Sequence, residues 1–211
     1  MRPPWIRARV IVFLTLLGSF AFFWHSRDWN TASRLILTYA MVDRGTIRLD
    51  GLNQQTGDIA HFQGHYYCDK LPGFSLVGTV PYAIARLTSR LPAHPLNVPA
   101  MTHWWADNWV TLGVSGLATA TAAILLMEIA RRLGCSPRTA SLVGLAYGLA
   151  TPAYVYGTLA YGHQLSAACL LGAYLLLWEP APRQTGGPRP FLAGVLASWA
   201  SVTELQVGPV S

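Results

Sequence analysis

The chain contains long runs of apolar residues, and each run predicts one or more helices. Residues 10–26 contain no Asp, Glu, Lys or Arg, and the same holds for residues 109–127 and 139–178. As one helix, the last run would be roughly 60 Å long, about twice the hydrocarbon core of a bilayer. We therefore predict that it folds back on itself near residues 157–162.

These runs predict an all-α fold in which transmembrane helices form a polytopic bundle. The first run follows a basic start, as in a signal peptide, but FFWHSRDW lacks the small-residue cleavage pattern, so we predict a retained span. The chain is predicted to be one partial transmembrane domain, 1–211. Its five spans are expected at about residues 10–25, 108–127, 139–157, 159–178 and 191–208.

Composition narrows the class of protein in the same direction. The chain is 52% hydrophobic and only 11% charged, whereas an ordinary soluble domain is about 25% charged. Such a chain has too few polar groups to cover a soluble surface, which excludes disorder and most soluble folds. The three cysteines show neither metal-site spacing nor a disulfide framework.

The distribution of charge predicts how the chain crosses the membrane. The chain has 15 Lys and Arg residues against 9 Asp and Glu. If the amino terminus is cytoplasmic, three clusters of arginine lie on the cytoplasmic side of the bacterial inner membrane, as the positive-inside rule predicts. That orientation requires residues 72–87, an apolar segment of ambiguous length, to be an interfacial helix; as a span it would reverse every later helix. Nucleic acid is not an expected partner, because the cations are split between both faces. The basic groups placed inside are Arg2, Arg7, Arg9, Arg131, Arg132, Arg138, Arg183 and Arg189.

A large external loop, residues 26–107, is predicted between the first two spans. Residues 33–42 have apolar positions at helical spacing and predict an amphipathic helix, and residues 46–50 predict a short extended piece. Together with the interfacial helix 72–87, this loop would cap the outer face of the bundle. A lipid-linked substrate would fit there, with its tail in the bilayer and its head group under the cap.

The segment from Ser33 to Leu87 resembles the first external loop of the GT-C membrane glycosyltransferases, and most closely the bacterial relatives of protein mannosyltransferases and lipid A aminoarabinose transferases. A short helix ends in glycine, and a Gly-x-x-Tyr-x-Asp-Lys-x-Pro motif follows at residues 64–72. The resemblance covers about residues 30–205. It implies an enzyme that moves a sugar from a polyprenyl-phosphate donor to an acceptor at the external face, with membrane lipids around it.

The chain departs from the family pattern in two ways. Family members usually open this loop with an acidic pair that supplies the catalytic base, and here Asn30-Thr31 lies near that place. Either Asp28 or Asp58 is then the candidate base. Family members also have more spans, so we expect this chain to be the amino-terminal part of a larger protein. The alternative function is a non-catalytic polytopic membrane protein, transporter-like or scaffolding.

The candidate site residues follow from this resemblance and from their chemistry. Lys70 and Arg34 are expected to bind the lipid phosphate, and Asp69 to orient Lys70, bind a metal or contact the acceptor. A carboxylate such as Asp58 is suited to deprotonate an acceptor hydroxyl. No metal site is predicted, although a divalent cation is compatible with the family. Four further substrate-binding candidates are His65, Tyr67, His163 and Glu204, the last as an acid inside a span.

Overall fold

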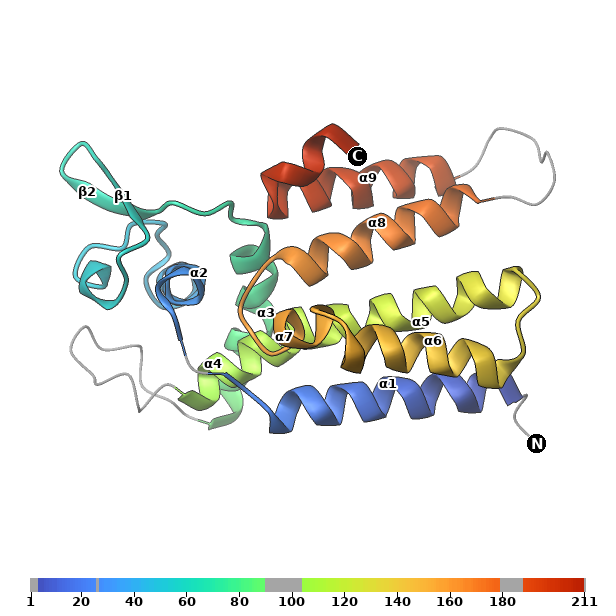
Figure 1. Ribbon diagram of the computed structural model, residues 1–211. Helices are drawn as coiled ribbons and strands as arrows, with labels where there is room; N and C mark the ends of the chain where they lie inside the picture. Colours follow the sequence, from blue (N-terminus) through green and yellow to red (C-terminus); the bar gives the residue numbers. More distant parts are fainter. Residues whose placement is uncertain (1–3, 26, 90–103, 179–187, 211) are drawn as a thin grey trace.

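The computed structural model describes residues 4–25, 27–89, 104–178 and 188–210. Five helices lie side by side with nearly parallel axes and alternating directions (Figure 1). They are α1 (Pro4–Phe22), α5 (Leu117–Arg132), α6 (Pro137–Ala150), α8 (His163–Leu177) and α9 (Pro188–Thr203). The all-α prediction is confirmed, because helices make up most of the described residues and the strands found among them form one two-stranded sheet.

Small residues allow the helices of the bundle to approach closely. Val12, Leu16 and Phe20 recur at a spacing of four on α1 and are its buried face. A Cβ atom on Gly148 of α6 would lie 2.5 Å from the Leu16 side chain, so only glycine fits that crossing. Gly144 of α6 likewise faces Met127 of α5. Such contacts between small residues are a common way of packing apolar helices.

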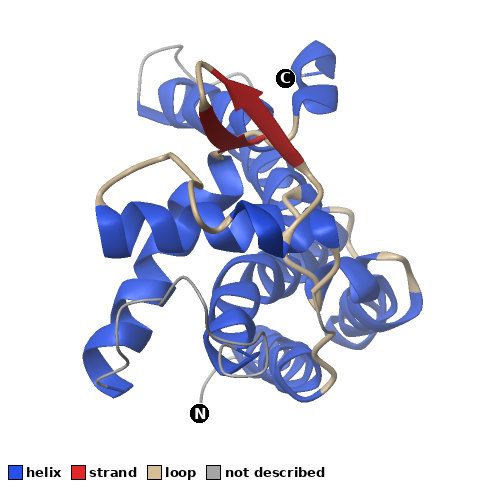
Figure 2. Ribbon diagram, turned by 90° about the vertical axis from the view of Figure 1, so that its left-hand side faces the viewer, coloured by secondary structure: helices blue, strands red, loops and turns tan. Residues whose placement is uncertain are grey.

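A second layer lies across one end of this bundle. It contains α2 (Trp29–Arg44), a 3-10 turn (Asn53–Gln55), the antiparallel strands β1 (Ile59–Phe62) and β2 (His65–Cys68), and α3 (Gly73–Ser89). In Figure 1, α2 is seen end-on while the bundle helices run across the page, and Figure 2 looks onto this end with the hairpin in red. We call this layer, residues 27–89, the cap.

The helices of the cap have recognisable start and stop signals. Asp28 is the N-cap of α2 and forms a capping box with Thr31. Gly45 ends the helix in the left-handed conformation, with φ of 62°. The predicted helices at 33–42 and 72–87 are therefore confirmed as helices, and both are longer than predicted. Of the predicted extended piece at 46–50, one residue is paired, since Arg48 forms an isolated β-bridge with Tyr67.

The sequence did not predict the hairpin, and two spans had wrong limits. Residues 139–157 were expected to be one helix, but α6 ends at Ala150 and a short α7 (Ala153–Gly157) follows the Thr151-Pro152 step. Residues before proline avoid the helical conformation, which explains the break. The last helix was expected to reach residue 208, but α9 ends at Thr203 and Leu205–Val210 form a 3-10 turn. The predicted reversal near 157–162 is confirmed.

Two helical segments are long and apolar enough to cross a membrane by length and composition. They are Pro4–Phe22 and Trp104–Arg132, and the second combines α4 (Trp104–Thr111), a π-helical turn (Leu112–Gly116) and α5. Helix α8 is apolar but shorter. Among the described residues, this finding supports membrane association of these two segments. It does not extend to the five spans that the sequence predicts.

Candidate functional site

The β-hairpin of the cap brings two carboxylates together. Ile59 pairs with Cys68, so the residues just outside this last pair, Asp58 and Asp69, lie next to each other at the open end. The turn at the other end is Gln63-Gly64, with φ of 50° and 80°. Two successive positive φ values are typical of the type I′ turn, which joins strands two residues apart. The hairpin register therefore creates this acidic pair.

Lys70 occupies the space between these two carboxylates. Its Nζ lies 3.1 Å from Oδ2 of Asp58 and 2.9 Å from Oδ2 of Asp69. Partial burial lowers the pKa of Lys70, but hydrogen bonds to Asp69 and Asp58 outweigh it and raise the pKa above its ordinary value. An ammonium has three N–H donors. Within the described part of the chain, Lys70 makes these two ion pairs. One N–H donor is then left for a ligand.

Arg34 is a buried cation on α2, with 4% of its surface exposed. Its Nη2 donates to Oε1 of Glu204 at 3.2 Å and its Nη1 donates to the side chain of Asn30. The guanidinium also lies over the ring of Tyr161, with 5.4 Å between Cζ and the ring centroid. Among the described residues, its buried Nε has no hydrogen-bond partner. Arg34 is therefore fixed in place, with its Nε enclosed by the protein and unpaired among the described residues.

Ser33 connects the two cationic groups. Its hydroxyl donates to the backbone oxygen of Asp58 at 2.7 Å and lies 3.0 Å from Sγ of Cys68. The next residue along α2 is Arg34, whose backbone oxygen accepts from Ser75 at the start of α3 at 2.8 Å. These hydrogen bonds thus join α2, which carries Arg34, to the start of α3 and to Asp58, the partner of Lys70; we call the polar residues of this junction the polar cluster.

Glu204 lies just past the end of α9 and joins the same cluster. It is 7% exposed, and Oε1 lies 3.3 Å from Nδ1 of His163. His163 begins α8 and stacks on Tyr161 at 5.4 Å between ring centroids. The structure therefore brings together three of the predicted site residues, Arg34, His163 and Glu204, across 170 positions of sequence. Lys70 pairs with Asp58, whose backbone oxygen accepts from the Ser33 hydroxyl on α2.

Asp28 has a structural role in this arrangement. One of its oxygens accepts from the backbone N–H of Thr31 at 2.6 Å and the other from the hydroxyl of Tyr161 at 2.9 Å. Burial alone raises its pKa, but these hydrogen bonds outweigh burial and lower the pKa below its ordinary value. Both oxygens are engaged, so the geometry assigns Asp28 to capping α2.

Two other predicted residues lie on the far side of the hairpin. Nδ1 of His65 is 2.7 Å from Oδ2 of Asp50, and Tyr67 is half-buried beside Arg48. Neither is joined to the cluster by a hydrogen bond or ion pair found within the described ranges. Within the same ranges no three His, Cys, Asp or Glu side chains lie close enough to hold a metal.

The sequence prediction missed a buried ion pair that fastens the cap to the bundle. Nη2 of Arg27 donates to Asp107 of α4 at 2.6 Å, and the hydroxyl of Tyr39 donates to the same carboxylate. Asp107 is 1% exposed. The available signal in the sequence was Asp107 itself, an acid in the first turn of an otherwise uncharged helix. Its partner Arg27 lies 80 residues earlier in the chain. Asn30 and Tyr161, which hold Arg34, were missed as well.

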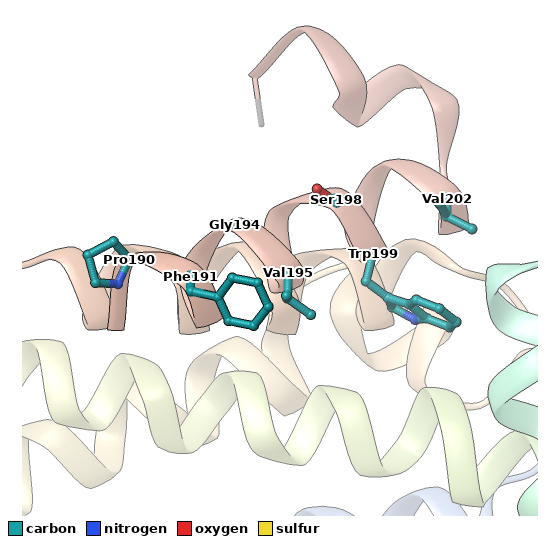
Figure 3. Close-up of a pocket in the computed structure, with 7 residues that line it drawn as sticks. All are labelled: Pro190, Phe191, Gly194, Val195, Ser198, Trp199 and Val202. Atoms are coloured by element: carbon teal, nitrogen blue, oxygen red, sulfur yellow. The ribbon is translucent and has the colours of Figure 1, made fainter. Parts of the chain in front are cut away.

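A shallow apolar groove of about 490 Å³ follows α9 on the outside of the bundle (Figure 3). Phe191, Val195 and Trp199 project from one side of the helix into this space. The groove ends at Val202, two residues before Glu204.

No protein-family description, curated protein or solved structure matches this chain in comparisons with known proteins. The resemblance to GT-C glycosyltransferases stays a prediction from the sequence.

Proposed function

We propose that the protein is a polytopic membrane protein of the bacterial inner membrane. The outward faces of the bundle helices carry large apolar side chains, such as Ile11 at 64% and Phe191 at 73% exposed. Leu142 of α6 and Leu177 of α8 are also exposed. Apolar faces on adjacent helices are stable against lipid and would associate in water. All five parallel helices then cross the bilayer, the shorter ones in a thinner local region.

The placement of arginine supports a cytoplasmic amino terminus. At the end of the bundle away from the cap, Glu128 of α5 pairs with Arg9, Arg131 and Arg132. Arg132 also donates to the backbone oxygen of Trp178 at 2.9 Å, beyond the end of α8. Basic residues gather on the cytoplasmic side of membrane proteins. The cap then lies on the external face.

The function supported best is transfer of a sugar from a polyprenyl-phosphate donor to an acceptor at that external face. One observation carries this proposal: two cations, Lys70 and Arg34, are held by carboxylates near the junction of the cap and an apolar bundle, and Lys70 is partly exposed with a third N–H donor beyond its two ion pairs. A departing lipid phosphate gains negative charge, and fixed cations stabilise it most at that moment. Asp58 and Asp69 orient Lys70 for this role.

The groove along α9 supports a lipid-linked donor. It is lined mostly by apolar side chains (Figure 3), and its last lining residue, Val202, precedes Glu204 by two positions in the sequence. If the head group of the donor lipid binds at the cluster, its isoprenoid tail can therefore lie along the apolar groove of α9.

The test uses the 211-residue protein reconstituted in liposomes with a radiolabelled polyprenyl-phosphate sugar and an extract of envelope acceptors. We expect sugar transfer by the natural protein and a loss of about 100- to 1,000-fold in Lys70→Ala, because one phosphate donor is removed. Arg44→Ala is the matched control, since Arg44 lies at the exposed far end of α2 and donates to the backbone of Asp50.

A non-catalytic membrane protein remains the second candidate, favoured by the fact that Asp28, Asp58, Asp69 and Glu204 all have partners. Absence of transfer by the natural protein, with intact folding and saturable binding of polyprenyl phosphate, would decide for it. Unchanged transfer by Lys70→Ala would instead reject the site.

A further inference from the structure

His163 differs from the other candidate residues in that a buried carboxylate holds one of its ring nitrogens while part of its side chain is exposed. Its side chain is 37% exposed, whereas the carboxylate of Glu204 behind it is 9% exposed. Tyr156 meets it edge-on at 4.6 Å and Tyr161 stacks on it at 5.4 Å between centroids. The imidazole is thus confined on its sides, while part of its surface reaches the outside.

The loop before His163 is itself fixed. A Cβ atom on Gly162 would lie 2.5 Å from Oε1 of Glu204 and 3.1 Å from the backbone oxygen of Thr203, so a larger residue would displace the carboxylate. The hydroxyl of Ser115, in the π-helical turn, donates to the backbone oxygen of Tyr161 at 3.0 Å. π-helical turns inside α-helices often occur at functional sites. The bundle therefore positions the histidine through the two residues that precede it.

The partner of Nδ1 determines which imidazole nitrogen is basic. A carboxylate near Nδ1 favours the tautomer in which Nδ1 carries the proton, so Nε2 keeps its lone pair. The carboxylates Asp28 and Asp58 do not offer a comparable base, since Asp28 caps α2 and Asp58 pairs with Lys70. Among the described residues of the cluster, His163 combines exposure, orientation and a free lone pair.

We propose that His163 is the catalytic base of the sugar transfer and that Glu204 is its positioning residue. The proposal rests on the proposed function. Nε2 takes the proton of the acceptor hydroxyl as its oxygen forms a bond to the anomeric carbon of the sugar. The bond from that carbon to the phosphate oxygen breaks, and its electron pair leaves with polyprenyl phosphate. The proton then passes from the imidazolium to water, and no oxidant or reductant is needed.

Several charged or titratable groups surround His163. Glu204 approaches Nδ1 from the end of α9, Tyr156 lies on α7, and Tyr161 lies on the preceding loop. Arg34 of α2 pairs with Glu204, and Asp28 accepts the Tyr161 hydroxyl. Arg34 balances the charge of Glu204, so the carboxylate orients the imidazole while the buried pair stays neutral as a whole.

The first test compares pH profiles of kcat for sugar transfer. In the natural protein kcat falls at acidic pH, because a protonated imidazole cannot accept a proton. His163→Gln is expected to lower kcat about 100- to 10,000-fold, to remove this acid limb and to leave the KM for the donor within about threefold. His61→Gln is the matched control, since His61 is exposed on the hairpin beside Tyr66. A kcat within twofold of the natural value in His163→Gln, with the acid limb retained, would overturn the proposal.

The second test does not depend on activity. Nitrogen-15 NMR of labelled histidine distinguishes the two imidazole tautomers, and His163→Gln identifies the resonance. We expect the Nδ1-protonated tautomer in the natural protein and a mixture in Glu204→Gln, with size-exclusion chromatography to check folding. An Nε2-protonated tautomer in the natural protein would reject the base assignment. If the natural protein shows the expected tautomer but transfers no sugar, the proposed function fails while the orientation of the histidine stands.

Discussion

At the scale of single residues, the cap contains charges whose roles the sequence alone does not separate. Asp28 and Asp58 were both candidate bases, because each is an acid in the same loop. The structure separates them by their partners, since Asp28 accepts from Thr31 and Tyr161 while Asp58 faces Lys70. Partners of this kind depend on chain segments far apart in sequence. Motif matching therefore located Lys70 and Asp69 but gave no account of what holds them.

Replacing Asp28 tests its role as a cap. Asp28→Ala is expected to reduce the free energy of unfolding by about 1 kcal/mol, since the N-cap of α2 is lost. Asp28→Asn retains a good N-cap and is expected to keep both stability and sugar transfer. Thermal unfolding in detergent and the transfer assay measure the two effects. Loss of transfer in Asp28→Asn at full stability would return the base role to this residue.

The lowered pKa of Asp28 also sets a pH dependence. The folded protein holds the charged carboxylate more strongly than the unfolded chain, whose Asp pKa is about 3.9. Its contribution to stability is therefore complete above that value and is lost as the pH falls through the lower folded-state pKa. We expect the difference in melting temperature between natural protein and Asp28→Asn to change only below about pH 4. A change centred near neutral pH would contradict this assignment.

The ammonium of Lys70 lies between the carboxylates of Asp58 and Asp69, a position that a divalent cation could occupy if Lys70 were absent. We expect sugar transfer to be unaffected by EDTA, because the ammonium already balances Asp58 and Asp69. In Lys70→Ala the two carboxylates are left facing each other, and added Mg²⁺ is expected to restore part of the lost rate. The assay with and without chelator measures both effects. Inactivation of the natural protein by EDTA would show that a divalent cation is required.

At the scale of secondary-structure elements, helices were predicted well and the hairpin was not. Apolar residues at helical spacing located α2 and α3, because a period of 3.6 is a strong signal over many residues. The strands Ile59–Phe62 and His65–Cys68 have four residues each and show no clear alternation. Their turn, Gln63-Gly64, is also weaker as a signal than Asn-Gly. The site formed by Asp58 and Asp69 was unpredictable for the same reason.

A substitution at Gly64 tests the importance of the hairpin register. Gly64 has φ of 80°, a conformation that costs an L residue about 1–2 kcal/mol. Gly64→Ala is expected to speed amide hydrogen exchange across residues 59–68 at least about fivefold and to lower sugar transfer. Gly18→Ala in α1 is the control, since a Cβ there meets open space and alanine favours a helix. Unchanged exchange in Gly64→Ala would mean that the turn tolerates another conformation.

At the scale of the whole molecule, charge placement predicts the orientation in the membrane. Cys135 lies in the turn between α5 and α6, at the end with Arg131 and Arg132. Gln63 lies at the hairpin tip of the cap. In spheroplasts of a Cys68→Ser, Gln63→Cys variant, we expect an impermeant maleimide to label position 63, while Cys135 reacts only after permeabilisation. The reverse pattern would place the cap inside the cell.

The pairing of Arg34 with Glu204 has a consequence for biogenesis. The acidic pair of the hairpin is complete within a few residues of chain, whereas Arg34 meets its carboxylate only after 170 further residues. At the ordinary pace of translation, about 5–20 residues per second, this interval is about 10–30 s. During that time a guanidinium destined for burial has no carboxylate to neutralise it, and it must stay hydrated at the membrane surface. Glu204, just after α9, therefore completes the ion pair of Arg34 only when nearly the whole described chain has been made.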